Sequence, residues 1–81
     1  MYYVYILKSI KSGIYYTGIA KNVEARLKEH NRGKSRFTKG HLPWVMVYHE
    51  GPYETKTARL KEKYYKSHAG KNELKSKGIL D

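Results

Sequence analysis

The sequence lacks cysteine, contains only two prolines and has few acidic residues. Without cysteine there is no disulfide framework and no thiolate metal site, a composition compatible with a reducing compartment. No stretch approaches the roughly 20 apolar residues of a membrane span, and the apolar start from Met1 to Leu7 is too short and too β-like for a signal peptide. We therefore expect a cytoplasmic protein with no membrane partner. Its 81 residues suffice for one small domain, residues 1–81.

Positive charge dominates the rest of the composition. The 17 Lys and Arg residues outnumber the 7 Asp and Glu residues, which gives a formal net charge of +10 at pH 7. Nucleic acid is the leading partner class, because the charges extend through predicted helices and a loop and are not confined to a tail. A merely soluble basic surface is the alternative. A membrane-binding helix is disfavoured, since the aromatic residues concentrate in strand-like runs.

Three segments have the composition of β-strands. The first two, Tyr2 to Lys8 and Ile14 to Ala20, are joined by a Ser- and Gly-containing turn and are expected to form a hairpin. The third strand is predicted from Trp44 to His49, with Gly51 and Pro52 as its end. Together they predict a small, largely antiparallel three-stranded sheet.

Helix signals separate and follow these strands. Asn22 is a suitable N-cap for a helix to about Asn31, with an apolar stripe of Ala20, Val23 and Leu27 and a stop at Gly33; residues 33–43 read as a basic surface loop. Thr55 is the expected cap of a second helix, in which Ala58, Tyr65 and Ala69 recur at helical spacing until Gly70. Residues 72–77 allow a short last helix. The order β-β-α-β-α predicts an α/β fold in which helices flank the sheet.

Tyr5 and Tyr16 occupy the two strands of the predicted hairpin. A register that joins Leu7 to Ile14 places the two tyrosines opposite each other on one face, where two phenols share a site. The alternative is an aromatic cross-strand pair that only stabilises the sheet. Gly18 lies within the second strand, where glycine often marks a bulge or a close approach of backbone or ligand.

Arg26 and His30 are one turn apart on the first predicted helix, so they project from the same face. The Arg fork can grip phosphate oxygens, and His can donate a hydrogen bond or transfer a proton near neutral pH. The alternative is a solvated helix face beside Glu29.

Glu62 lies on the face of the second helix that is expected to turn inward, between Ala58 and Tyr65. A carboxylate in that place needs a partner. An ion pair with Arg59 or Lys66 would supply one. The other reading is a ligand for Mg²⁺, which takes one or two carboxylates, waters and substrate phosphate oxygens.

The segments in this order resemble the GIY-YIG nuclease superfamily, in particular its small stand-alone single-domain group. The two motifs that name the family correspond to Tyr3-Val4-Tyr5 and Tyr16-Thr17-Gly18. The family's Arg-bearing helix is similar to Val23 to Asn31, and the helix that presents its metal-binding Glu resembles Ala58 to Lys66. The group's loop and third strand look like the basic segment Thr38 to Trp44 and Val47 to Glu50. Tyr3 stands where the name has Gly and Thr17 where it has Ile, but neither change removes a catalytic side chain. Asn72 is a poor positional match for the family's late Asn and is assigned no role.

The resemblance implies a DNA endonuclease that uses Mg²⁺ or Mn²⁺, with structure-selective or weakly specific cleavage. It implies one active site of Tyr5, Tyr16, Arg26, His30 and Glu62, with Glu62 holding the metal. Lys34, Arg36, Lys39 and His41 are expected to hold the DNA backbone. Branched, nicked or single-stranded DNA are candidate substrates, RNA is not excluded, and the oligomeric state stays open. The alternatives are a non-catalytic nucleic-acid-binding module with the nuclease fold, and a small protein-interaction domain.

Overall fold

The computed structural model describes all 81 residues. Its elements are β1 (Tyr2–Ser9), β2 (Tyr15–Ala20), α1 (Val23–Asn31), α2 (Arg36–Lys39), β3 (Trp44–Tyr53), α3 (Thr55–Lys66) and α4 (His68–Ser76). The three strands form one antiparallel sheet in the order β2-β1-β3, so the predicted α/β class and three-stranded sheet are confirmed. None of the helices is both long and apolar enough to cross a membrane.

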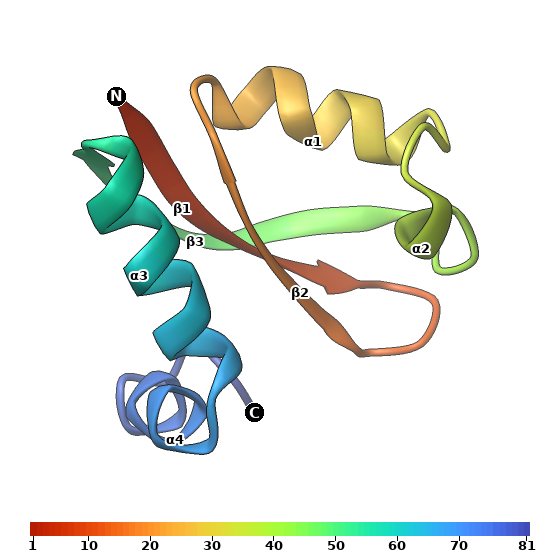
Figure 1. Cartoon of the computed structure of the whole chain (residues 1–81). Helices are drawn as coiled ribbons and strands as arrows, with labels where there is room; N and C mark the ends of the chain where they lie inside the picture. Colours follow the sequence, from red (N-terminus) through yellow and green to blue (C-terminus); the bar gives the residue numbers. More distant parts are fainter.

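The helices cover the two faces of the sheet (Figure 1). Alternate residues of β1 point to opposite faces, so Val4 and Ile6 pack with Ala58 of α3, whereas Tyr5 and Leu7 face the side covered by α1. The apolar residues therefore make two small cores, one on each side of a shared central strand.

The hairpin register differs from the predicted one by two residues. Tyr16 pairs with Leu7, and Tyr5 pairs with Gly18. The strands pair further toward the turn than this register allows, because the Ser9 amide still donates a backbone hydrogen bond of 2.8 Å to the Ile14 carbonyl; Gly13, in the turn, adopts a positive φ of 75°. The prediction that Tyr5 lies directly opposite Tyr16 was therefore wrong. A shift of two keeps both side chains on the same face, so they meet diagonally.

The prediction that Gly51 and Pro52 end the third strand was wrong. β3 continues through Gly51 and Pro52 to Tyr53, with an irregularity in its pairing to β1 between Tyr2 and Val4. Gly51 has a φ of +127°, and a Cβ there would lie 3.0 Å from the carbonyl oxygen of Tyr2. Glycine here bends the strand without interrupting it.

The helix boundaries also differ in part. Asn22 caps α1 as predicted, accepting a 3.0 Å hydrogen bond from the Ala25 amide. The N-cap of α3 is Glu54 and not Thr55, and α3 ends at Lys66, well before Gly70. Ser67 caps a separate helix, α4, by accepting from the amide of Gly70 at 3.2 Å, so the last helix begins earlier than residue 72. Gly70 lies inside α4, where a Cβ would sit 1.9 Å from the Tyr64 carbonyl oxygen.

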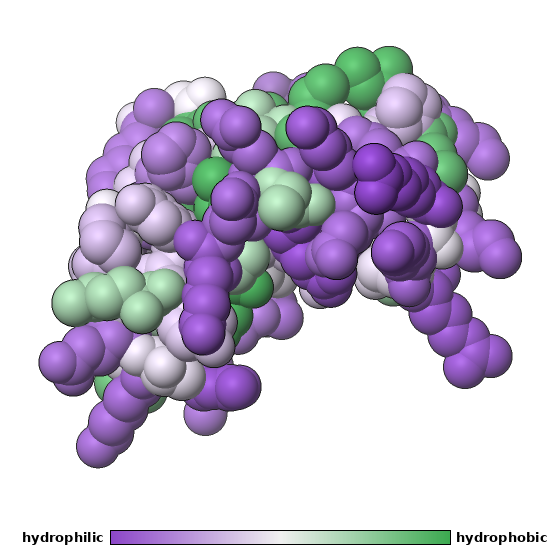
Figure 2. Space-filling model, turned by 90° about the horizontal axis from the view of Figure 1, so that it is seen from above, coloured by the Kyte–Doolittle hydropathy of each residue, from purple (hydrophilic) through white to green (hydrophobic).

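A hollow lies along one side of the molecule. Figure 2 looks down onto α1 and shows an outline with a lobe at each end, and mostly hydrophilic atoms line the concave side. This side faces the viewer of Figure 1, where β2 crosses between α3 on the left and α2 on the right. The edge strand β2 therefore borders the hollow.

Candidate active site

Tyr5 is the inner member of the tyrosine pair. Only 1% of its surface is exposed, and its ring lies over Gly18 of the neighbouring edge strand. A Cβ at residue 18 would lie 2.6 Å from the Tyr5 hydroxyl oxygen and 3.1 Å from the Tyr16 ring. Gly18 was expected to mark a bulge or a close approach of backbone or ligand, but the group that approaches it is a side chain: the missing Cβ makes room for the Tyr5 phenol.

A chain of hydrogen bonds leads from Tyr5 into the interior. Its hydroxyl lies 2.9 Å from Nε2 of His30, and Nδ1 of His30 lies 2.8 Å from Oγ1 of Thr38. The Thr38 hydroxyl donates to the carbonyl of Ser35 at 3.4 Å, so it accepts the Nδ1 hydrogen of His30. Nε2 is then left as the acceptor of the Tyr5 hydrogen. His30 is fully buried, which makes the solvated-face alternative wrong for this residue.

The environment of this chain shifts both titrating groups toward their neutral forms. Burial lowers the pKa of His30, and the nearby positive charge of Arg26 lowers it further, against a smaller opposing effect of Glu29. Burial raises the pKa of Tyr5 to about 12, with Tyr16 and Glu62 acting in the same direction and Arg26 against it. At neutral pH the pair is a phenol that donates to an imidazole.

Tyr16 is the outer phenol. Its ring centroid lies 6.3 Å from that of Tyr5 and 5.0 Å from that of His30, and it stacks on Phe37 at 6.1 Å with an interplanar angle of 27°. The side chain is only half buried, and its hydroxyl has no hydrogen-bond partner within the protein. It is free to bind a ligand.

Arg26 reaches from α1 toward the same phenol. Its guanidinium forms a 3.0 Å ion pair with Glu29, with about a third of the side chain exposed. Its charge also acts on Tyr5 and on His30. The helix therefore brings Arg26 and His30 to one centre, as their spacing predicted, although Arg26 shares its charge with Glu29.

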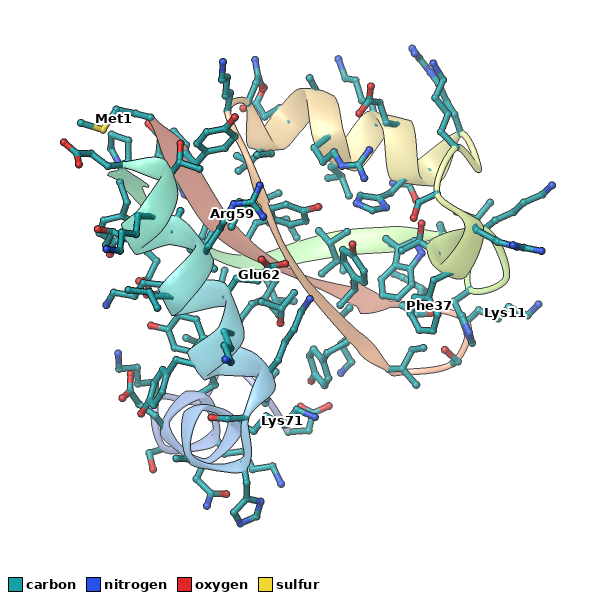
Figure 3. All side chains as sticks on the ribbon, viewed as in Figure 1. Met1, Lys11, Phe37, Arg59, Glu62 and Lys71 are labelled. Atoms are coloured by element: carbon teal, nitrogen blue, oxygen red, sulfur yellow. The ribbon has the colours of Figure 1, made fainter.

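Glu62 approaches from α3. Its carboxylate points toward β2 (Figure 3) and lies close enough to Tyr5 to raise the pKa of that phenol. Glu62 Oε2 forms a 3.1 Å ion pair with Lys66, which is one of the two partners considered from the sequence. The side chain keeps 23% of its surface exposed. Arg59 carries no ion pair and points from α3 toward the same side.

The donor set restricts how a metal ion could be held. No group of three or more His, Asp or Glu side chains lies together where it could hold an ion. A single carboxylate with one oxygen outside the ion pair fits the mode of Mg²⁺, in which waters and substrate phosphate oxygens supply the other ligands. Glu62 fits that mode, whereas the side chains around it could not hold an ion without water or substrate.

The basic loop contains the short helix α2, which the sequence did not predict. Three side chains of this loop are exposed: Lys34, which precedes α2, and Arg36 and Lys39, which lie on it. His41 is half buried, with a 3.1 Å hydrogen bond between its Nδ1 and Ser12 Oγ and its ring against Phe37 and Trp44. Three of the four expected backbone-binding residues are therefore open to a ligand.

Two residues that hold the site together were not singled out from the sequence. Thr38 is fully buried and both orients His30 and accepts, through its carbonyl, the 2.8 Å hydrogen bond of Trp44 Nε1. Asn31 bonds the amide and the carbonyl of Trp44 at 2.7 and 3.0 Å, which ties the end of α1 to the start of β3. The sequence signal for Asn31 was only a polar side chain at the end of a helix, which is also typical of ordinary caps, and Thr38 was one polar residue within the basic loop.

Three comparisons place this geometry among known proteins. Residues 1–75 match the model of the GIY-YIG catalytic domain. The chain is 47% identical over 64 residues to UPF0213 proteins of Staphylococcus aureus strains Mu3 and N315, an alignment that covers 78% of this chain and 76% of each relative. It also resembles the solution NMR structure of the UPF0213 protein BH0048 from Bacillus halodurans, with a TM-score of 0.54 and 35% identity, covering 94% of this chain and 84% of that one. The family match includes every strand and helix except the last residue of α4.

Proposed function

Because the chain belongs to the GIY-YIG catalytic-domain family, we propose that it is a divalent-metal-dependent endonuclease that hydrolyses phosphodiester bonds in DNA with structure-selective or weakly specific cleavage. The observation that carries this proposal is the convergence of four elements on one phenol. Tyr5 of β1 is packed against Gly18 of β2, hydrogen bonded to His30 of α1 and under the charge of Glu62 of α3. A purely structural tyrosine pair requires neither the buried imidazole nor the nearby carboxylate.

The two phenols have different tasks in this proposal. Tyr16, half exposed with a free hydroxyl, holds the attacking water in line with the departing oxygen. Tyr5 accepts the proton of that water while giving its own to Nε2 of His30. A free phenolate is therefore never needed, which matters because a pKa of about 12 makes phenolate scarce at neutral pH.

Charge on the phosphate is met by side chains from two helices. Arg26 stabilises the phosphoryl oxygens as negative charge develops on them. Glu62 would hold Mg²⁺ or Mn²⁺, which would polarise the phosphate and stabilise the leaving oxygen. Lys34, Arg36 and Lys39 contact the DNA backbone without reading its sequence.

The second candidate function is a nucleic-acid-binding module that keeps the fold but cuts nothing. The ion pair of Glu62 with Lys66 and the near-complete burial of Tyr5 favour it. Hydrolysis requires that the metal bind Glu62 through the carboxylate oxygen that Lys66 leaves unpaired.

The test is incubation of the native protein, Glu62→Ala and Arg26→Ala with duplex, nicked, branched and single-stranded DNA, in Mg²⁺, Mn²⁺ or EDTA. We expect metal-dependent products from the native protein and strongly reduced product from both variants. Equal product from all three proteins would refute the active-site assignment. Tight, salt-sensitive binding without any product would favour the binding module.

A further inference from the structure

Phe37 is the only phenylalanine of the chain, and 54% of its surface is exposed. Isolated exposed apolar residues are common on protein surfaces and need no function by themselves. Phe37 differs because of its neighbours. It lies on α2, at the side of the hollow opposite α3 and the labelled Arg59 (Figure 3).

The ring is held in a fixed place against the candidate active site. It stacks on Tyr16 at 6.1 Å and lies 5.3 Å from the ring of His41. The next residue, Thr38, is fully buried and bonded to both His30 and Trp44, so α2 cannot slide along the surface without breaking that network. Phe37 is thus an exposed aromatic surface built onto the outer phenol.

The charge around the ring selects the kind of ligand. Arg36 and Lys39 flank Phe37 on α2, both are exposed, and neither forms an ion pair within the protein. No acidic residue occurs between Glu29 and Glu50. An aromatic face between free cations suits a ligand with a flat π-system and an adjoining phosphate, because bases stack on aromatic rings and phosphates pair with Arg and Lys.

We infer that Phe37 is a stacking platform for an unpaired nucleobase of the DNA strand held at the active site. The inference rests on the proposed function and adds to it the class of substrate: DNA with a nick, flap, branch or single-stranded segment beside the cleaved phosphate. In an intact duplex both faces of a base are already stacked. Phe37 can contact such a base only after it has been unstacked, which costs free energy. Selectivity for unpaired DNA follows without any sequence-reading contact.

The test measures binding in EDTA, where cleavage cannot occur. One fluorescently labelled oligonucleotide is used single-stranded, in a flapped duplex and in a fully paired duplex, with 2-aminopurine in the unpaired segment. The proteins are native, Phe37→Leu, which keeps an apolar side chain but removes the aromatic face, and Phe37→Trp, which restores it. Leu60→Ala is the matched control, since Leu60 is 60% exposed on α3. Melting temperatures verify that all four proteins fold.

We expect Phe37→Leu to weaken binding to the single-stranded and flapped probes by about 5- to 150-fold, the range that corresponds to the loss of one base stack. Binding to the paired duplex should change by less than about twofold, on the scale of a surface substitution. Phe37→Trp should retain the affinity and the quenching of 2-aminopurine, and Leu60→Ala should match the native protein. Equal loss on all three probes, or none, would overturn the inference while leaving the proposed function intact. Absence of DNA binding by the native protein would overturn both.

Discussion

The hydroxyl of Tyr5 donates a hydrogen bond of 2.9 Å to Nε2 of His30, and both side chains are buried. The bond joins the first strand to the first helix across 25 residues of sequence. Its direction is set from the far side of the imidazole, where Thr38 accepts the Nδ1 hydrogen. A tyrosine with a neutral proton acceptor already in place is equipped for proton transfer, whereas Tyr16 lacks such a partner.

The two phenols should therefore respond differently to loss of their hydroxyls. Tyr5→Phe should lower the cleavage rate by about 100-fold or more, the usual contribution of general acid–base catalysis. It should also destabilise the fold by about 1–3 kcal/mol, because Nε2 of His30 stays buried without a donor. Tyr16→Phe should reduce the rate while leaving the free energy of unfolding nearly unchanged. Single-turnover rates and urea unfolding of both variants measure these effects; equal stability losses would contradict the assigned asymmetry.

Gly18 should tolerate no side chain. In Gly18→Ala the new Cβ meets the Tyr5 hydroxyl at 2.6 Å, so the phenol must move. We expect a loss of about 1–3 kcal/mol in stability, typical of overpacking, and loss of cleavage. Gly40→Ala is the control, since its φ is −78° and the nearest atom to its Cβ would be 3.9 Å away. Thermal unfolding should show a lower melting temperature only for Gly18→Ala; a similar change in both variants would contradict the close-approach account.

His30 should make the stability depend on pH below about 6.5. Its pKa is lowered in the folded state, so the unfolded chain binds a proton first as the pH falls. The stabilisation by neutral His30 is complete above the unfolded pKa and is lost as the pH falls toward the folded pKa. We expect the free energy of unfolding of the native protein to decrease between pH 7 and pH 5 more steeply than that of His30→Gln. Parallel curves from urea titrations at each pH would contradict this.

Glu50 should be important for the placement of α3. Its Oε1 accepts hydrogen bonds of 2.6 Å from both Tyr48 and Tyr65, and its Oε2 accepts one of 2.9 Å from Tyr53. Glu50→Gln replaces an acceptor by a donor that faces a tyrosine hydroxyl, which should cost about 1–3 kcal/mol of stability. Glu54→Gln, at an exposed carboxylate without a hydrogen bond, is the control. Denaturant midpoints should separate the two variants, and an unchanged midpoint for Glu50→Gln would show that the cluster does not stabilise the fold.

Local patterns in the sequence predicted the strands and helices better than the register and packing between them. The strands, the Asn22 cap and the inward side of the second helix follow from alternation, capping and helical spacing. The hairpin register did not follow, because it depends on how many residues the turn uses, and Ser9 to Ile14 allowed more than one solution. Gly70 appeared as a stop because glycine commonly ends helices, yet here it permits α4 to cross the end of α3.

The sequence allowed the residues of the candidate site to be proposed, but not their burial, hydrogen bonds or ion pairs. Spacing placed Arg26 and His30 on one helix face, and the family resemblance added Tyr5, Tyr16 and Glu62. That His30 is fully buried depends on Thr38, which the sequence presents only as one polar residue in a basic loop. The pairing of Glu62 with Lys66 could not be distinguished from other helical ion pairs before the structure was known.

The central claim, that this chain cuts DNA with Glu62 as its metal-binding carboxylate, is tested most directly by the single-turnover cleavage rate in Mg²⁺. Native protein is compared with Glu62→Gln and with Glu73→Gln, which removes a carboxylate that is likewise paired with a lysine at helical spacing, but on α4. We predict that Glu73→Gln cuts at the native rate and that Glu62→Gln is slower by about 100-fold or more, as expected when a metal ligand is lost. Equal rates for all three proteins, or no metal-dependent product from the native protein on any DNA structure, would contradict the account.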